Sequence, residues 1–385
     1  METMHELQLE KGSHHNNTPR PTELALTKRR NIWTVLCYQT ISLLAIIYFL
    51  WQHGFLTFAR QTVCTRADCA LQVTNFPQYV IDYAPLVWLD EDETYFPSDI
   101  SAQVENTHPD VNFSTIVDAP DPLTLDNLDA LNKYGNKGFD VFLTSKLDVT
   151  TNPIWLEGVV PDSHGKTKGA SSCAIIINDR GSGRVDAFYM YFYAYNQGNT
   201  VLFHELGDHI GDWEHNMIRF QDGKPETMWF SQHGNGQAFT YDAVEKEDIR
   251  PISYSAAGSH ANYAIAGSHD HSIPDANLPF GFLIDHTSQG VLWDPTLNAY
   301  LYVYNGTDRS FSAGGNGTSP VGAMNFKGQW GDQQYPESDP KQGKPFFGFY
   351  KYVGGPTGPW NKGLNRTLTC PDNAIRCIIR TIRGP

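Results

Sequence analysis

The chain has 385 residues, with 28 Lys or Arg against 42 Asp or Glu and a formal net charge of −14. This acidity argues against a nucleic-acid partner, which would need a basic face. A hydrophobic content of 40% with 13% aromatic residues argues against a disordered chain. Only 18% of the residues are charged, and 33 Gly and 23 Pro are present, which is typical of a turn-rich β protein rather than a helical bundle.

The N-terminal segment predicts a membrane anchor. Residues 1–30 are polar, and we expect a disordered cytosolic tail that ends in the basic triplet Lys28-Arg29-Arg30. Residues 31–51 carry no charge and, at about 1.5 Å per residue, would span roughly 30 Å, the thickness of a bilayer core. We therefore predict a single-pass type II transmembrane signal anchor, with everything beyond it lumenal. A buried core helix and a cleaved signal peptide are the alternatives.

Two kinds of residue beyond the anchor fit a lumenal, glycosylated protein of the secretory or vacuolar pathway. The N-x-S/T sequons predict glycosylation at Asn112, Asn305, Asn316 and Asn365, whereas Asn16 lies on the cytosolic side and should stay bare. An oxidising lumen would allow disulfides between Cys64 and Cys69 and between Cys370 and Cys377, although pairing of the first couple with the second is equally open. Cys173 would be left over as a buried thiol.

The region after the anchor is predicted to be a mostly β protein. Residues 52–75 form a stalk, residues 76–360 a single β-sandwich with a few short helices, and residues 361–385 an extension with a Cys pair. The strand candidates are 174–177, 188–195, 213–220, 228–233, 252–256 and 300–304. The run at 188–195 (FYMYFYAY) is aromatic on both faces and predicts a central strand covered on both sides. A helix is expected near residues 124–134.

The net charge differs between the N-terminal tail and the rest of the chain. The first 30 residues hold five Lys or Arg and four Asp or Glu, which leaves 23 basic against 38 acidic residues beyond them and a net charge of −15 there. Solubility is one interpretation of this acidity, and a cation-binding surface is the other.

The most informative motif is the run from Gly207 to His215 (GDHIGDWEH). On a strand, side chains alternate, so Asp212 and Glu214 share one face about 6.5 to 7 Å apart, with His209 in a Gly-flanked loop beside them. Carboxylates suit Ca²⁺, Mg²⁺ or Mn²⁺, and the His admits Zn²⁺. A general acid/base pair is a second interpretation, and a turn that starts a strand, with Asp212 capping the backbone, is a third.

Two further histidines follow strand candidates, so we expect His233 and His260 to join His209, Asp212 and Glu214 in one divalent-cation site. We interpret the group His269-Asp270-His271 as a solvated loop, and Asp285-His286 and Trp293-Asp294-Pro295 as turns. The sequence holds no G-x-S-x-G elbow and no H-E-x-x-H helix, so nucleophilic catalysis and a standard zinc-protease motif find no support.

Several blocks resemble the vacuolar protein sorting-associated protein 62 family. They are 83–89 (YAPLVWL), 95–100 (YFPSDI), 195–198 (YNQG), 211–215 (GDWEH), 231–234 (SQHG) and 258–263 (GSHANY), in that order. The resemblance covers roughly residues 76–360, and fungal members typically carry an N-terminal membrane anchor. It implies a role in delivering proteins to the vacuole and no established enzymatic activity.

A more distant likeness concerns residues 209–214 (HIGDWE), which are similar to the GHRHDWE heptapeptide of the necrosis- and ethylene-inducing cytolysins. Those proteins are secreted β-sandwiches that hold a divalent cation with this motif and dock to membrane sphingolipid. The likeness implies that His209, Asp212 and Glu214 are ligands. It departs at Ile210 and Gly211, where the cytolysins have Arg and a second His.

Three hypotheses follow. The first is a membrane-anchored lumenal module in vacuolar protein targeting, which binds a glycan, lipid or cargo protein through a divalent cation and is not an enzyme. The second is a metal-dependent hydrolase acting on a glycan or lipid, and the third is a structural domain without a site.

Overall fold

The computed structural model describes residues 76–272, 278, 281–374 and 376–384. The expected tail, anchor and stalk, with Cys64 and Cys69, lie outside the described residues. Within the described part, no helix has the length and apolar character needed to cross a membrane.

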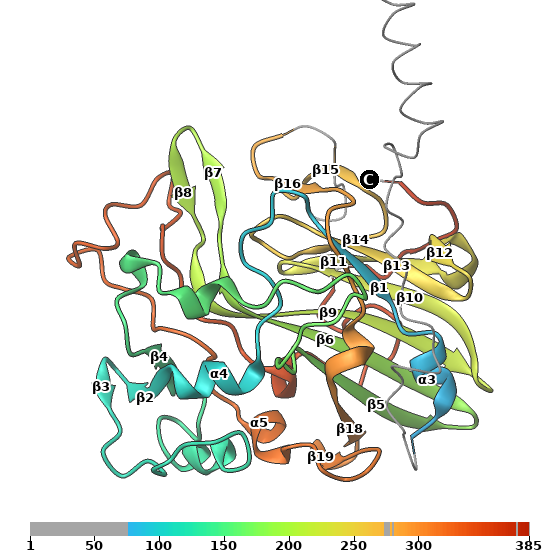
Figure 1. Ribbon diagram of the computed structural model, residues 1–385, viewed down its shortest axis with the longest axis horizontal. Helices are drawn as coiled ribbons and strands as arrows, with labels where there is room; N and C mark the ends of the chain where they lie inside the picture. Colours follow the sequence, from blue (N-terminus) through green and yellow to red (C-terminus); the bar gives the residue numbers. More distant parts are fainter. Residues whose placement is uncertain (1–75, 273–277, 279–280, 375, 385) are drawn as a thin grey trace, which may run out of the picture. The chain divides into compact units, whose positions relative to one another are not determined.

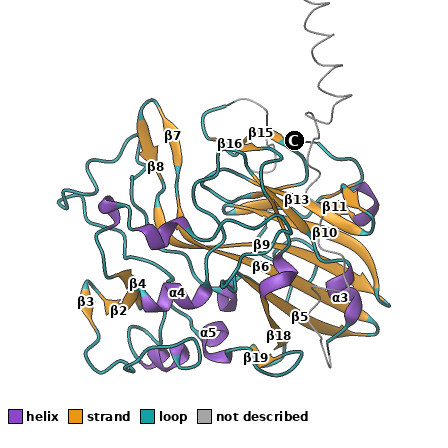
Figure 2. Ribbon diagram, in the orientation of Figure 1, coloured by secondary structure: helices purple, strands orange, loops and turns teal. Residues whose placement is uncertain are grey.

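The described chain is mostly β, as predicted, with short helices at its periphery (Figure 2). Its largest element is an eight-stranded sheet in the order β19-β18-β5-β6-β9-β10-β11-β20. Their bounds are β19 Ser310–Ala313, β18 Ala299–Asn305, β5 Cys173–Gly181, β6 Arg184–Asn196, β9 His209–Gln221, β10 Lys224–Gln232, β11 Asn235–Thr240 and β20 Ile379–Arg380. The four predicted strands at 174–177, 188–195, 213–220 and 300–304 lie inside β5, β6, β9 and β18.

A second sheet has the order β12-β13-β1-β17, and a further strand, β14, pairs with β13. The bounds are β12 Lys246–Glu247, β13 Arg250–Ser255, β1 Leu86–Leu89, β17 Leu292–Trp293 and β14 Asn262–Tyr263. Smaller sheets pair β15 (Gly267–Asp270) with β16 (Ile284–Thr287), β7 (Asn199–Val201) with β8 (His204–Leu206), and β2 (Thr107–Val111) with β3 (Ser114–Thr115) and β4 (Phe142–Ser145). The paired strands β7 and β8 lie side by side in Figure 1, as do β15 and β16.

The helices are all short. The α-helices are α3 Gln78–Asp82, α4 Ile100–Glu105 and α5 Val321–Asn325; the 3₁₀ helices are η1 Leu128–Lys133, η2 Val149–Thr151, η3 Ile154–Glu157, η4 Tyr241–Ala243, η5 Pro295–Asn298 and η6 Pro359–Asn361. The helix expected at 124–134 is thus the shorter η1. Before η1 begins, the Asn127 side chain accepts a hydrogen bond from the Thr124 amide, so residues 124–127 form a turn rather than a helix. Leu128 and Leu131 are buried, as their spacing predicts.

The apolar and aromatic side chains on both faces of β6 explain why the long sheet is covered on both sides. Its residues are buried from Val185 to Asn196, which confirms the prediction of a doubly covered strand. Phe188, Met190 and Phe192 pack on one face, against α4, η1 and α5. Tyr189, Tyr191 and Tyr193 pack on the other, against β1 and Trp293 of the second sheet. The predicted sandwich therefore has a further layer of short helices, because an apolar strand must bury both faces.

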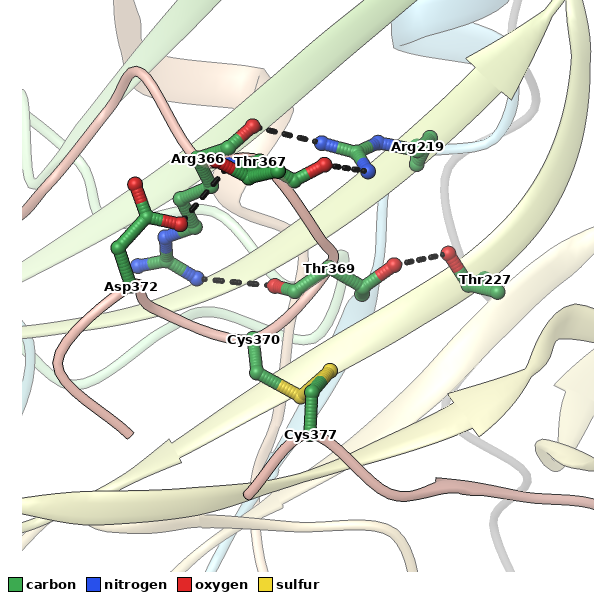
Figure 3. Close-up of a disulfide and its surroundings, with 8 residues drawn as sticks. All are labelled: Arg219, Thr227, Arg366, Thr367, Thr369, Cys370, Asp372 and Cys377. Atoms are coloured by element: carbon green, nitrogen blue, oxygen red, sulfur yellow. Dashed lines mark hydrogen bonds between the residues drawn. A yellow bond between two sulfur atoms is a disulfide. The ribbon is translucent and has the colours of Figure 1, made fainter. Parts of the chain in front are cut away.

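The C-terminal segment (residues 361–374) lies on the long sheet (Figure 3). Arg366 is 1% exposed and donates to Nε2 of His215 on β9 at 2.7 Å. Arg219 on β9 pairs with Asp186 on β6 and also donates to the carbonyl of Thr367. Cys370 of this segment forms a disulfide with Cys377 beyond it, and Cys173 is a buried free thiol. Because a buried arginine requires its acceptors, the segment is part of the folded unit rather than a tail.

The asparagines of the sequons at 112, 305, 316 and 365 are all exposed. Their glycosylation stays a prediction.

Candidate functional site

Four of the five predicted site residues meet at a cavity of about 380 Å³. Among the residues that line it are His209, Asp212, Glu214, His233, His271 and Lys362. Strands β9, β10 and β15 and the C-terminal segment bring these side chains together from distant parts of the sequence.

β9 supplies the two carboxylates. Asp212 pairs with Tyr193 and Glu214 with Tyr191 across the β6–β9 ladder, so both carboxylates lie on the same face, as the alternation predicts. Gly211 between His209 and Asp212 has φ +68°, and a Cβ there would lie 1.9 Å from the Trp330 carbonyl oxygen. Only glycine fits this close approach, which sets the position of the first carboxylate.

His209 keeps a lone pair on one of its ring nitrogens. Its Nδ1 lies 2.8 Å from the carbonyl oxygen of Gly211, and because a carbonyl can only accept, Nδ1 carries the proton. Burial lowers the pKa of His209, although the charge of Asp212 opposes this. The imidazole is therefore neutral at neutral pH, and Nε2 keeps the lone pair that a metal ion requires.

His260, which the sequence analysis placed among the ligands, lies behind Asp212 instead. It has no exposed surface, and its ring stacks on Tyr193 at a centroid distance of 3.7 Å. Nδ1 donates to Oδ2 of Asp212 and Nε2 to the Tyr95 carbonyl, both at 3.0 Å. Burial alone would lower the pKa of His260, but Glu93 and Asp212 raise it to about 10. With both nitrogens protonated, His260 orients Asp212 and offers no lone pair to a metal ion.

The neighbours of the two carboxylates shift their pKa values in opposite directions. Burial would raise the pKa of Asp212, but the hydrogen bond from His260 and the nearby His209 lower it. For Glu214, burial and the charge of Asp212 raise the pKa to about 8. Glu214 accepts a hydrogen bond from the Ser231 hydroxyl, which itself accepts from the His215 amide. One carboxylate is therefore ionised and its neighbour is largely protonated at neutral pH.

His233 follows β10 directly and has φ +52°. Its Nε2 donates to Oδ2 of Asp285 at 2.7 Å, and its side chain remains 31% exposed. Burial of the ring would lower the pKa of His233, but Asp285 raises it to about 9. His233 is thus paired with Asp285, and it also lines the cavity that the carboxylates of β9 line.

Two predicted loops are wrong. The group 269–271, expected to be a solvated loop, includes part of β15, and His269 and Asp270 are buried. Asp285, interpreted as a turn residue, lies in β16 and is 1% exposed, with hydrogen bonds from the Ser259 and Tyr263 hydroxyls. The only signal for a strand here was the short apolar run 282–284 in front of Asp285.

The predicted ligands on β9 lie around one cavity but are spread apart. Among the described residues, His209, Asp212 and Glu214 line the cavity but do not bring three ligand atoms within 4.8 Å of one another.

The chain is similar in sequence to two yeast proteins. Residues 193–292, which contain β9, His233 and Asp285, match the family model of vacuolar protein sorting-associated protein 62. The chain is 38% identical over 324 residues to TDA6, a vacuolar protein sorting-associated protein by name, from Saccharomyces cerevisiae. It is 35% identical over 326 residues to vacuolar protein sorting-associated protein 62 of the same yeast. Each match covers 77% of this chain and 68% of the relative.

Solved structures similar to this chain include Necrosis and Ethylene inducing Protein 2 from the causal agent of cocoa's Witches Broom disease. The identity is 15%, the match covers 53% of this chain and 75% of that chain, and the TM-score is 0.24. A non-toxic protein, HaNLP3, gives 10% identity, 63% and 82% coverage, and a TM-score of 0.26. A TM-score of this size establishes no shared function.

Proposed function

The chain belongs to the vacuolar protein sorting-associated protein 62 family, and from that membership we propose that it acts in protein targeting to the vacuole. It does so as a membrane-anchored module on the lumenal side of the secretory pathway, and it binds rather than transforms its ligand. Residues 31–51 provide the anchor, and the β-rich domain provides the binding surface.

The binding site in this proposal is the cavity at β9, where a divalent cation is held by His209, Asp212 and Glu214. The observation that carries it is the pair of carboxylates on one face of β9, of which one is ionised and the other largely protonated. A bound cation would replace the proton on Glu214 and bridge both carboxylates, with the free Nε2 of His209 as a nitrogen ligand. Ca²⁺, Mg²⁺, Mn²⁺ and Zn²⁺ all accept this set of donors.

The cation would in turn bind the ligand. A cavity of about 380 Å³ is at the lower end of the size of small-molecule sites and accommodates a sugar unit, a lipid head group or one side chain of a cargo protein. Oxygen atoms of any of these can complete the coordination of a divalent cation.

The double variant Asp212→Asn/Glu214→Gln tests the proposal in cells and in the purified protein. It removes both negative charges with almost no change in volume, so we expect loss of the bound cation and loss of delivery of a vacuolar cargo enzyme. The control is Asp222→Asn/Glu226→Gln, which removes the same charge from exposed positions of the β9–β10 hairpin outside the cavity. Normal cargo delivery by the Asp212→Asn/Glu214→Gln chain, at an expression level equal to that of the control, would refute the proposed function.

A further inference from the structure

A second set of potential ligands consists of His233 and His271, which line the same cavity, and Asp285 behind them. The ligand atoms of these three side chains lie within 4.8 Å of one another, closer than in any other three His, Cys, Asp or Glu side chains of the described residues. We propose that they bind a Zn²⁺ ion, in a site separate from the cation site at β9.

The distances fit a zinc ion with little rearrangement. Zinc bonds of 2.0–2.1 Å at tetrahedral angles place neighbouring ligand atoms about 3.3 Å apart. Nε2 of His233 lies 2.7 Å from Oδ2 of Asp285, and Nε2 of His271 lies 3.9 Å from Oδ1 of the same carboxylate. These distances lie on either side of the required separation and run to the two different oxygens of one carboxylate, so zinc binding would require small movements of the imidazoles and of the carboxylate.

The carboxylate is already oriented by its surroundings. Asp285 is 1% exposed, and it accepts hydrogen bonds from the Ser259 hydroxyl at 2.8 Å and from the Tyr263 hydroxyl at 2.7 Å. Hydrogen bonds of this kind hold metal-binding carboxylates in position and increase the affinity of the site. A buried carboxylate held by two hydroxyls is thus ready to bind without reorganising the core.

The two imidazoles are held in place from three chain segments. His233 follows the end of β10, His271 follows the end of β15, and Asp285 lies in β16, which pairs with β15. The rings of His233 and His271 stack with their centroids 3.9 Å apart, and Nε2 of His271 donates to the Asn199 side chain at 2.9 Å. A zinc ion on Nε2 of His271 would replace this hydrogen bond to Asn199, with the ring proton carried on Nδ1 instead.

The composition of the set favours zinc over the harder cations. Two imidazole nitrogens and one carboxylate oxygen suit Zn²⁺, whereas Ca²⁺ and Mg²⁺ prefer oxygen ligands alone. The side chains of His233 and His271 are 31% and 18% exposed, and both line the cavity. The fourth tetrahedral position therefore faces the cavity, where a water molecule or an oxygen atom of a ligand can occupy it.

The zinc site takes His233 out of the ligand group that the sequence predicted. His233 was predicted to join His209, Asp212 and Glu214, but its ring nitrogen contacts Asp285 instead. The two proposals therefore rest on different side chains and can fail separately.

Zinc binding by the full-length purified chain tests the inference. The chain is stripped with a chelator, dialysed against Zn²⁺ in the presence of a chromophoric competitor, and analysed for bound metal by mass spectrometry. The variants are His233→Asn, in which asparagine tolerates the positive φ, and His271→Asn. His286→Asn is the matched control, because His286 is the exposed neighbour of Asp285 on β16.

We expect the wild type and His286→Asn to hold a tightly bound Zn²⁺ that His233→Asn and His271→Asn bind with an affinity lower by at least about 100-fold, whether or not a cation also occupies the site at β9. Co²⁺ should give the intense visible bands of a tetrahedral site in the first two chains only. The Asp212→Asn/Glu214→Gln chain should keep this zinc, so its failure to sort cargo would concern the proposed function alone.

Two results would overturn the inference. One is a wild-type chain that binds no zinc under these conditions, and the other is a His271→Asn chain with the zinc affinity of His286→Asn. Thermal unfolding of the metal-free variants checks that any loss of zinc is not a loss of the fold.

Discussion

The ion pair between Arg250 and Asp294 provides the sharpest test of how the second sheet is held together. Arg250 opens β13, and Asp294 directly follows β17. The guanidinium donates to both carboxylate oxygens, at 2.5 and 2.8 Å, and to the carbonyls of Ala84 and Pro85 in front of β1. One side chain therefore links the three strands β13, β1 and β17.

The substitution Asp294→Asn removes the charge and keeps the shape. The side chains of Arg250 and Asp294 are only 19% and 5% exposed, so the remaining guanidinium would be left without a counter-charge in a largely dry environment. Removal of one partner from a buried pair lowers the free energy of unfolding by about 3–5 kcal/mol. Because Arg250 is partly exposed, we expect a loss of about 3 kcal/mol. With roughly 300 folded residues and an unfolding entropy of about 2.1 cal/mol/K each, this lowers the midpoint of thermal unfolding by about 5 °C.

The control is another Arg–acid pair in the same molecule. Arg383 donates to Glu245 at 2.6 Å, but the side chains are 40% and 37% exposed, so Glu245→Gln should cost at most about 1 kcal/mol. Both variants are compared by urea and thermal unfolding at pH 7. Equal losses in the two variants would refute the reasoning, because distance alone would then decide the strength of a pair and burial would not matter.

Three further predictions concern pH, the disulfide and topology. Burial would raise the pKa of Asp294, but Arg250 lowers it, so its stabilisation is fully present above about pH 5 and is lost as the pH falls below about 4; the wild type should lose this contribution in acid urea titrations, and Asp294→Asn should not. The substitution Cys377→Ser removes a disulfide that spans a sequence separation of 7 and should destabilise the chain by about 2.5 kcal/mol. Reductant should destabilise the wild type and Cys173→Ala, which keeps the disulfide, and should have no further effect on the stability of Cys377→Ser. Deglycosylation should increase the gel mobility of the full-length chain, and a quadruple Asn→Gln variant at 112, 305, 316 and 365 should abolish the shift; unchanged mobility of the wild type would contradict a lumenal location.

The strands were predictable where their pattern is local. β6 and β9 are long and dense in apolar and aromatic residues, and the alternation along β9 correctly placed Asp212 and Glu214 on one face. The site was less predictable, because its other walls come from pairings over long distances in sequence. Gly267 pairs with Thr287 across a connection that no periodicity reveals, so His271 and Asp285 were assigned to loops.

His260 shows a different limit of the sequence. Its type and its place after a strand candidate fit a metal ligand, but only the fold reveals that Asp212 and the Tyr95 carbonyl occupy both of its nitrogens. Likewise, nothing in the local sequence around Lys362 indicates a cavity residue. Its position depends on Arg366, whose buried guanidinium donates to the Lys362 carbonyl at 3.2 Å and anchors the C-terminal segment to β9.

The two carboxylates of β9 explain why the cavity needs positive charge from elsewhere in the fold. Asp212 and Glu214 share one face of a buried strand, and two like charges there cannot both ionise without compensation. His260 provides that compensation to Asp212 through a direct hydrogen bond, whereas Glu214 has a neutral serine as its hydrogen-bond partner, and the charges of Lys362 and His233 do not offset burial and the charge of Asp212. The asymmetry leaves a proton on Glu214 at neutral pH. A divalent cation beside both groups would displace that proton, so cation binding should release about one proton per chain at pH 7, and calorimetry in buffers of different ionisation enthalpy would measure it. Binding without proton release would mean that Glu214 does not contact the cation.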